Sequence, residues 1–85
     1  MKIPSAGIEW DDGNREKCCK HGLSIADVEH VLVQQEVLIV PTDRTPGAEQ
    51  RLIAIGRTAA GQYAFVVFTP RNREGETFIR PISAR

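Results

Sequence analysis

The sequence has 85 residues, of which 41% are hydrophobic and 26% are charged, and its 11 basic and 11 acidic residues cancel. This length suits one domain with a small core, and the composition is that of a soluble globular protein. No stretch approaches the roughly 18 apolar residues that cross a bilayer, and the N-terminus lacks an apolar segment of signal-peptide length. We therefore expect a cytoplasmic protein with no membrane partner.

A short strand and a helix are predicted at the start of the chain. Residues 7–10 have strand-like character. Asp11 or Asp12 can then cap a helix by accepting hydrogen bonds from free backbone amides. This helix is expected to run to about Lys20 and to end at Gly22, which can adopt the left-handed conformation of a helix C-terminus.

A second helix is predicted to begin at Ser24, where Asp27 follows at the spacing of a capping box. Its core-facing stripe has helical spacing and consists of Ile25, Val28, Val31 and Leu32. The adjacent Cys18 and Cys19 indicate small, partly buried helix residues, because neighbouring cysteines rarely form a disulfide and two sulfurs do not complete a zinc site.

The rest of the chain is predicted to be strands and loops. Residues 37–40 are an apolar run that ends at Pro41, and residues 41–50 are turn-forming and polar. Three strand-like runs follow closely: residues 51–57, 62–69 and 77–83. Residues 70–76 form a polar connection. Such spacing predicts antiparallel hairpins, so we expect an α+β fold with two helices on one face of a small, mainly antiparallel sheet of about four strands.

The charges divide unevenly along this pattern. Residues 1–49 contain nine acidic and five basic residues, whereas residues 50–85 contain six arginines and two glutamates. Arginine suits bidentate phosphate contacts, and a basic field attracts polyanions. The strand-rich half is therefore a candidate RNA or phosphate surface, although solvated arginines on ordinary strands would give the same composition.

The last predicted strand carries an arginine in an unusual setting. Arg80 shares a face with Phe78 and Ile82. An arginine between two hydrophobic residues indicates either a guanidinium held on a partly apolar surface or an internal ion pair. Pro81 cannot donate to a strand ladder, so the strand is expected to be an edge or to be locally broken there.

Several short strings follow one another along the chain. They are Ile8-Glu9-Trp10-Asp11, Lys20-His21-Gly22-Leu23-Ser24, Glu49-Gln50-Arg51, Ile55-Gly56-Arg57, Val67-Phe68-Thr69 with Arg71, and Ile79-Arg80-Pro81-Ile82-Ser83-Ala84-Arg85. In this order and at these separations they resemble the BrnT-type toxins, the ribonuclease components of bacterial type II toxin–antitoxin systems. That family is similar to the RelE/ParE toxins in fold. The resemblance covers essentially all of the chain.

The resemblance implies a single RelE/BrnT-like domain over residues 1–85. Members of the family usually continue into a polar C-terminal helix, and this sequence ends at Arg85 without it. The implied activity is cleavage of RNA with no metal or cofactor. The implied partner is a cognate antitoxin, a small BrnA-like ribbon-helix-helix protein, in a homodimer or a toxin–antitoxin heterotetramer.

RNA cleavage of this kind uses attack by the 2′-hydroxyl on the neighbouring phosphate, which requires a base, cations and an acid. The candidate catalytic residues are Lys20, His21, Arg57 and Arg80. The histidine titrates nearest neutrality, the lysine beside it could hold a phosphate, and the two arginines could brace the phosphate as fixed forks. We expect both arginines to converge beside the Lys20–His21 corner.

Further candidates for substrate binding are Arg51, Arg71, Glu49 and Phe68. Arg71 could follow the adjacent RNA backbone, Glu49 could act as a base or orient an arginine, and Phe68 or Tyr63 could stack a base.

Simpler roles exist for several of these candidates. His21 could satisfy carbonyls at the helix end, and Lys20 could be a solvated cation. Glu49 could pair with Arg51, and Phe68 and Tyr63 could belong to the core.

A second class of function also fits the sequence. The chain could be a non-catalytic module that binds an antitoxin or nucleic acid, either as a degenerate toxin or as a ParE-like inhibitor that acts by binding. Cleavage of free RNA in EDTA that is lost in Arg80→Ala would distinguish the enzyme from such a module.

Overall fold

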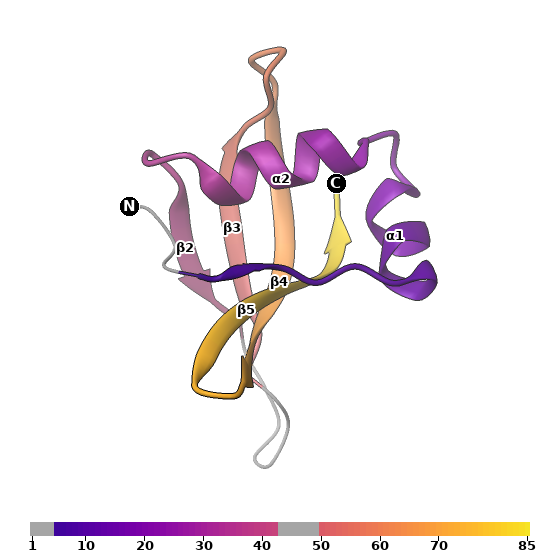
Figure 1. Cartoon of the computed structure of the whole chain (residues 1–85). Coiled ribbons are helices and arrows are strands. Elements are labelled where there is room, and N and C mark those ends of the chain that lie inside the picture. Colours follow the sequence, from indigo (N-terminus) through magenta and orange to yellow (C-terminus); the bar gives the residue numbers. More distant parts are fainter. Residues whose placement is uncertain (1–4, 43–49) are drawn as a thin grey trace.

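The computed structural model describes residues 5–42 and 50–85 (Figure 1). Its helices are α1 (Asp12–Cys19) and α2 (Ile25–Val33). Its strands are β1 (Gly7–Ile8), β2 (Leu38–Pro41), β3 (Leu52–Arg57), β4 (Tyr63–Arg73) and β5 (Glu76–Ala84). The predicted α+β class and both predicted helices are confirmed. No helix among the described residues has the length and apolar character needed to cross a membrane.

The described strands form one five-stranded sheet in the order β1-β5-β4-β3-β2. Neighbouring strands are antiparallel except for β1, which pairs in parallel with β5 through Gly7 opposite Phe78 and Ile8 opposite Ile79. The expected number of about four strands is therefore too low. A two-residue strand that pairs with a partner some seventy positions away has no hairpin signal in the sequence, which is why this pairing was not predicted.

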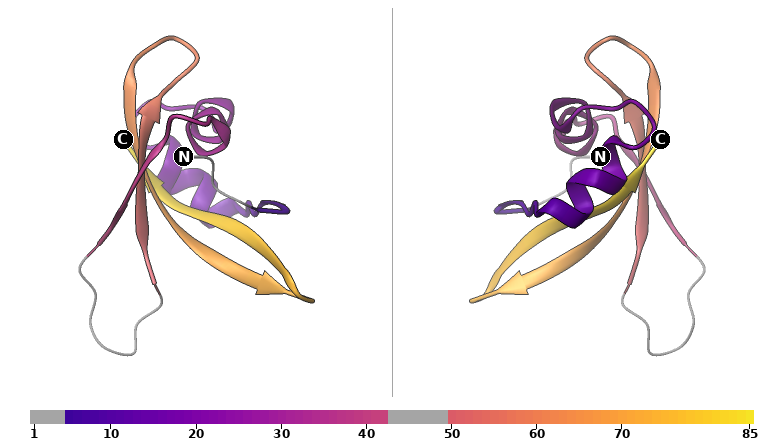
Figure 2. Two further views of the ribbon diagram at one scale, coloured as in Figure 1. Left: turned by 90° about the vertical axis from the view of Figure 1, so that its left-hand side faces the viewer. Right: turned by 90° about the vertical axis from the view of Figure 1, so that its right-hand side faces the viewer.

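The β4–β5 hairpin is longer than predicted. Residues 70–76 do not form an extended connection, because β4 continues to Arg73 and β5 begins at Glu76. Only Glu74 and Gly75 form the turn, both with positive φ (52° and 83°), as a two-residue hairpin of type I′ requires. Beyond the last β3 pair this hairpin bends toward the side of the sheet on which the helices lie (Figure 2). The part of the hairpin beyond Thr69 is mostly exposed to solvent, which agrees with its polar sequence.

The core lies between α2 and one face of the sheet. On β4, Ala64, Val66 and Phe68 alternate with more exposed residues and are buried against α2. Val28, Val31 and Leu32 of the predicted stripe are also buried. The opposite sheet face has no helix on it in the described part of the chain, and we call it the open face (Figure 2).

The helix ends are built as the sequence predicts. Asp11 and Asn14 form the capping box of α1, and Ser24 and Asp27 form that of α2. Gly22 adopts a left-handed conformation (φ 91°) in the turn between the helices.

The two cysteines are both free, but they differ in exposure. Cys18 is fully buried in the core and Cys19 is exposed. Burial raises the pKa of the Cys18 thiol to about 11.

Candidate functional site

Two arginines from different strands belong to one cross-strand row of the sheet. Arg80 lies opposite Thr69 in the β4–β5 register. In the β3–β4 register Leu52 lies opposite Phe68, so the preceding Arg51 falls opposite Thr69 from the other side. With neighbouring strands about 4.8 Å apart, the backbones of the two arginines are separated by about 10 Å.

Both arginines line one pocket of about 230 Å³ together with Lys17 of α1. The other lining residues are Gly13, Asn14, Pro81 and Ile82. We call this the basic pocket. Its three cations come from α1, from the residue just before β3 and from β5, which are far apart in the sequence.

A β-bulge in β5 lies at the pocket wall. Val67 lies opposite Ser83 and Phe68 lies opposite Pro81, so Ile82 is an extra residue on β5. Bulges bend a strand and redirect its side chains, and they are common beside functional sites. The predicted break at Pro81 is thereby confirmed.

Arg80 is oriented by an ion pair. Its Nη2 atom lies 2.6 Å from Oδ2 of Asp11, and the two side chains are 27% and 50% exposed. The backbone N–H of Asn14 and the guanidinium of Arg80 lower the pKa of Asp11 below its usual value. The sequence suggested either a guanidinium on a partly apolar surface or an internal ion pair for Arg80. The structure shows an ion pair, but a partly exposed one, at the edge of the basic pocket.

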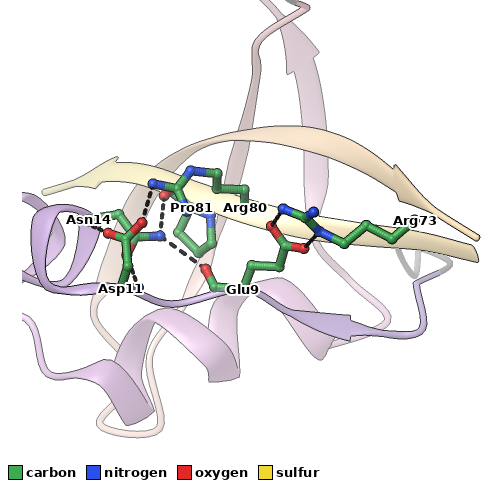
Figure 3. A network of polar contacts seen from close by, with 6 residues as sticks. All are labelled: Glu9, Asp11, Asn14, Arg73, Arg80 and Pro81. Carbon is green, nitrogen blue, oxygen red and sulfur yellow. Dashed lines mark hydrogen bonds and ion pairs between the residues drawn. The ribbon is translucent and has the colours of Figure 1, made fainter.

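Asn14 fixes α1 against the sheet at this point (Figure 3). Its side chain is almost fully buried, with 4% of the residue exposed. The amide nitrogen donates to the carbonyl oxygens of Glu9 (2.9 Å) and Pro81 (2.8 Å), and the amide oxygen accepts from the backbone N–H of Asp11 (2.7 Å). One side chain therefore joins the strand before α1, the helix cap and the bulged segment of β5.

Glu9 lies among three arginines next to this network. It forms a two-pronged ion pair with Arg73, whose Nη2 donates to Oε1 at 3.2 Å and whose Nε donates to Oε2 (Figure 3). This pair lowers the pKa of Glu9, and the charges of Arg80 and Arg71 lower it further. Glu9 is thus a negative charge that orients Arg73 of β4.

Arg57 lies at the other end of the sheet. It pairs with Tyr63 beside the β3–β4 turn, whereas Arg80 pairs with Thr69, six residues farther along β4. At about 3.3 Å per residue this separation is about 20 Å. The expected convergence of Arg57 and Arg80 is therefore not found, because the two lie at opposite ends of the same ladder.

The environment of Arg57 is also different. Its Nη2 donates to the Tyr63 hydroxyl at 3.1 Å, and its guanidinium carbon lies 4.8 Å from the centre of that ring. The Tyr63 hydroxyl raises the pKa of Arg57.

A family model described as "Ribonuclease toxin, BrnT, of type II toxin-antitoxin system" matches residues 10–85. The chain belongs to this family. Membership implies RNA as the substrate and a protein antitoxin as the partner, which agrees with the resemblance seen in the sequence. Comparisons with curated proteins and with solved structures found no match.

The other catalytic candidates of this BrnT-family protein lie at the end of α1. Lys17 and Lys20 line a second pocket, of about 630 Å³, with Gly13, Glu16 and Cys19. His21 is exposed in the turn that follows and comes four residues after Lys17. Lys17 in the last turn of α1 and Lys20 at its C-cap therefore extend positive charge from the basic pocket toward the turn that carries His21.

Most of the predicted substrate-binding residues can be placed. Arg51 lines the basic pocket, and Arg71 follows Thr69 by two residues, so it is on the same face of β4 as the row that contains Arg80. Phe68 is only 2% exposed in the core, so its assignment as a stacking platform is wrong. Tyr63, which is 65% exposed, keeps that possibility. Glu49 lies outside the described residues.

Sequence reasoning missed several residues of this site in the BrnT-family chain. Lys17 had a detectable signal, because it precedes Lys20 by one helical turn. Asp11 was predicted as a helix cap but not as the partner of Arg80. The role of Asn14 could not be read locally, because two of its acceptors lie in other segments. Among the described residues, no three His, Cys, Asp or Glu side chains are grouped so that they could hold a metal ion.

Proposed function

We propose that this chain is a metal-independent endoribonuclease and that the basic pocket binds the scissile phosphodiester of single-stranded RNA. The observation that carries the proposal is the presence of Lys17, Arg51 and Arg80, from three separate elements, around one pocket. Rigid guanidinium groups are the side chains best suited to hold a phosphate in a fixed orientation.

The ion pair between Arg80 and Asp11 supports this role. In this pair Arg80 contacts the carboxylate of Asp11, an oxyanion that also accepts the N–H of Asn14 at the start of α1. In the proposed complex a phosphate oxygen accepts hydrogen bonds from the Arg80 N–H groups that face the pocket. Asp11 remains the helix cap and keeps the guanidinium in position.

The reaction follows from the chemistry of RNA. The 2′-oxygen attacks the adjacent phosphorus while its proton passes to a base, and the bond from phosphorus to the 5′-oxygen breaks as that oxygen receives a proton from an acid. The products are a 2′,3′-cyclic phosphate and a free 5′-hydroxyl. Arg51, Arg80 and Lys17 stabilise the charge that develops on the phosphate oxygens, which is commonly the largest single contribution to such catalysis.

His21 is the proposed proton-transfer group, with Lys20 beside it as a second phosphate contact. Imidazole is the side chain that most often serves as a general acid or base in enzymes. His21 lies in the turn directly after α1, next to the C-cap residue Lys20 and four residues after Lys17 of the basic pocket. Arg71 is proposed to contact the neighbouring phosphate.

The decisive experiment compares two arginine variants on a labelled single-stranded RNA in EDTA. Arg80→Ala is expected to lower the cleavage rate by about 10²- to 10³-fold, the usual effect of removing one group that stabilises transition-state charge. Arg57→Ala is the matched control, because it removes an arginine of the same sheet about 20 Å away, and it should change the rate by less than about threefold.

Thermal melting would establish that both variants fold, and Arg80→Lys should be intermediate in rate. Equal losses in Arg57→Ala and Arg80→Ala would contradict the assignment of the basic pocket. A wild-type protein that binds RNA but leaves it intact would favour the non-catalytic alternative.

A further inference from the structure

The open face of the sheet is apolar over β2, β3 and the first half of β4. The strand registers place Leu38, Ile55 and Phe65 in one cross-strand row, and Val40, Ile53 and Val67 in the next. Leu38 is 59% exposed and Phe65 is 46% exposed. A contiguous apolar surface of this kind usually marks an interaction site, because single exposed hydrophobic residues are common but clustered ones are not.

The strand residues next to this apolar surface carry only positive charges, and the acidic strand residue Glu76 lies at the far tip of the β4–β5 hairpin, opposite Arg73. Residues 38–42, 50–73 and 77–85 contain no Asp or Glu. Arg57 lies opposite Tyr63 at one margin, and Arg85 exchanges two backbone hydrogen bonds with Phe65 (2.7 and 2.9 Å) at another. Glu36, just before β2, is the acidic group near Arg57.

We infer that the open face is the docking surface for an acidic, amphipathic segment of a protein partner, with apolar side chains over Leu38, Ile55 and Phe65 and carboxylates toward Arg57 and Arg85. This inference rests on the proposed function, because a toxin of this family has a protein antitoxin as its partner. In such a complex the apolar side chains of both proteins are buried against each other. The ion pairs of Arg57 and Arg85 with partner carboxylates determine which partner binds and in which orientation.

The dimensions of the surface suit a helix. Three neighbouring strands span about 10 Å, which equals the diameter of one helix with its side chains. Successive cross-strand rows are about 7 Å apart, close to the spacing between apolar side chains on adjacent turns of a helix.

Other occupants fit the surface less well. A second copy that placed its own open face here would bring Arg57 and Arg85 together with like charges, which opposes association. RNA phosphates would have to be desolvated over aliphatic side chains that offer no hydrogen-bond donors. The charge and the apolar character are satisfied together only by a segment that has carboxylates beside an apolar stripe.

The test uses two synthetic helical peptides with the same leucine stripe, one with glutamates and one with lysines on its flanks. Each is titrated into isotope-labelled full-length protein, and backbone amide shifts are followed by NMR. The acidic peptide should bind at least about tenfold more tightly than the basic one, with the shifts gathered on β2, β3 and the first half of β4. Phe65→Ser should weaken binding about tenfold or more, as truncation of a central anchor commonly does.

Two variants sharpen the test. Arg57→Glu should abolish the preference for the acidic peptide, because the margin then carries one negative charge beside the positive Arg85 while the apolar centre stays intact. Val33→Ser is the matched control, since Val33 is 55% exposed but lies on α2 away from this face, and it should leave binding unchanged.

Three results would overturn the inference. The first is a failed peptide titration, in which neither peptide binds at millimolar concentration, both bind equally, or the amide shifts lie on another surface. The second is a dimer of the free protein that Phe65→Ser dissociates, which would make the surface a contact between copies. The third is loss of RNA binding or cleavage in Phe65→Ser, which would assign the face to RNA. Failure of the proposed nuclease site would instead appear in Arg80→Ala, without any change in peptide binding.

Discussion

Asn14→Ala is the substitution that best tests how the candidate site is held together. Asn14 makes hydrogen bonds to the carbonyl oxygens of Glu9 and Pro81 and to the backbone N–H of Asp11. Its removal leaves these groups without that partner, and leaving a buried polar group unsatisfied costs about 1–3 kcal/mol. Only the bond to Pro81 is fully buried, so the others regain some hydration. We expect the free energy of unfolding to fall by about 2–4 kcal/mol, a large part of the roughly 5–15 kcal/mol of a typical domain.

The assay is urea unfolding followed by the fluorescence of Trp10, the single tryptophan of the chain. Trp10 is packed against the core and donates from Nε1 to Glu29 at 3.0 Å, so its emission reports the loss of the folded state. The expected signature is a lower midpoint with an unchanged dependence on urea, because the same surface is exposed on unfolding. Asn72→Ala is the matched control, since the hydrogen bond that the Asn72 side chain accepts from Thr77 is exposed. A change of less than about 0.5 kcal/mol in Asn14→Ala, the range of ordinary surface substitutions, would refute the role given to this side chain.

Two further predictions concern titratable groups. The pKa values of Glu9 and Asp11 are lowered in the folded protein, so the stabilisation they give is complete above their ordinary values of 4.5 and 3.8 and is lost as the pH falls through the lower folded values. Urea midpoints should therefore decrease as the pH falls below about 4.5, and Glu9→Gln should flatten this decrease; a midpoint that does not change with pH below this value would contradict the two ion pairs. The cysteines should differ in reactivity, because Cys18 is buried with a pKa raised to about 11 whereas Cys19 is exposed. Iodoacetamide at pH 8 should modify Cys19 alone in the native protein and both residues in urea, as peptide mass analysis would show; equal modification of both in the native protein would contradict the burial of Cys18.

Local signals in the sequence were sufficient for much of the fold. The capping residues Asp11 and Ser24, the left-handed Gly22 and the stripe on α2 each act within one or two turns of chain, so their effect can be read without tertiary structure. The antiparallel order of β3, β4 and β5 follows from short connections in the same way. The parallel pairing of β1 with β5 and the extension of β4 through Pro70 depend on distant partners. Pro70 is tolerated because it lies beyond the last paired residue of β3, where β4 is an edge on that side.

The candidate site was predicted less completely, for the same physical reason. Alternation placed Arg51 and Arg57 correctly on one face of β3, but alternation does not give the distance along the sheet. Only the register shows that Arg51, and not Arg57, shares a row with Arg80. The prediction that Arg57 and Arg80 converge is therefore wrong, and Arg51, predicted only as a substrate-binding residue, is the arginine that lines the pocket with Arg80. Lys17 enters the site through the packing of α1 on β5, which Asn14 determines by contacts with two remote carbonyls.

The position of Arg51 connects the two proposals. It lines the basic pocket with Arg80, and it also precedes β3 on the face that carries Ile53 and Ile55. A partner helix that covered the apolar rows and continued along β3 would reach Arg51 with its acidic side chains. It would then compete with RNA for one of the three pocket cations without entering the pocket itself. Arg51→Ala should consequently weaken RNA binding and antitoxin binding together, whereas Phe65→Ser should weaken antitoxin binding alone. Measuring both affinities for these two variants separates competition at a common residue from neutralisation at a distance. If Arg51→Ala reduced RNA binding and left antitoxin binding unchanged, the two surfaces would be independent.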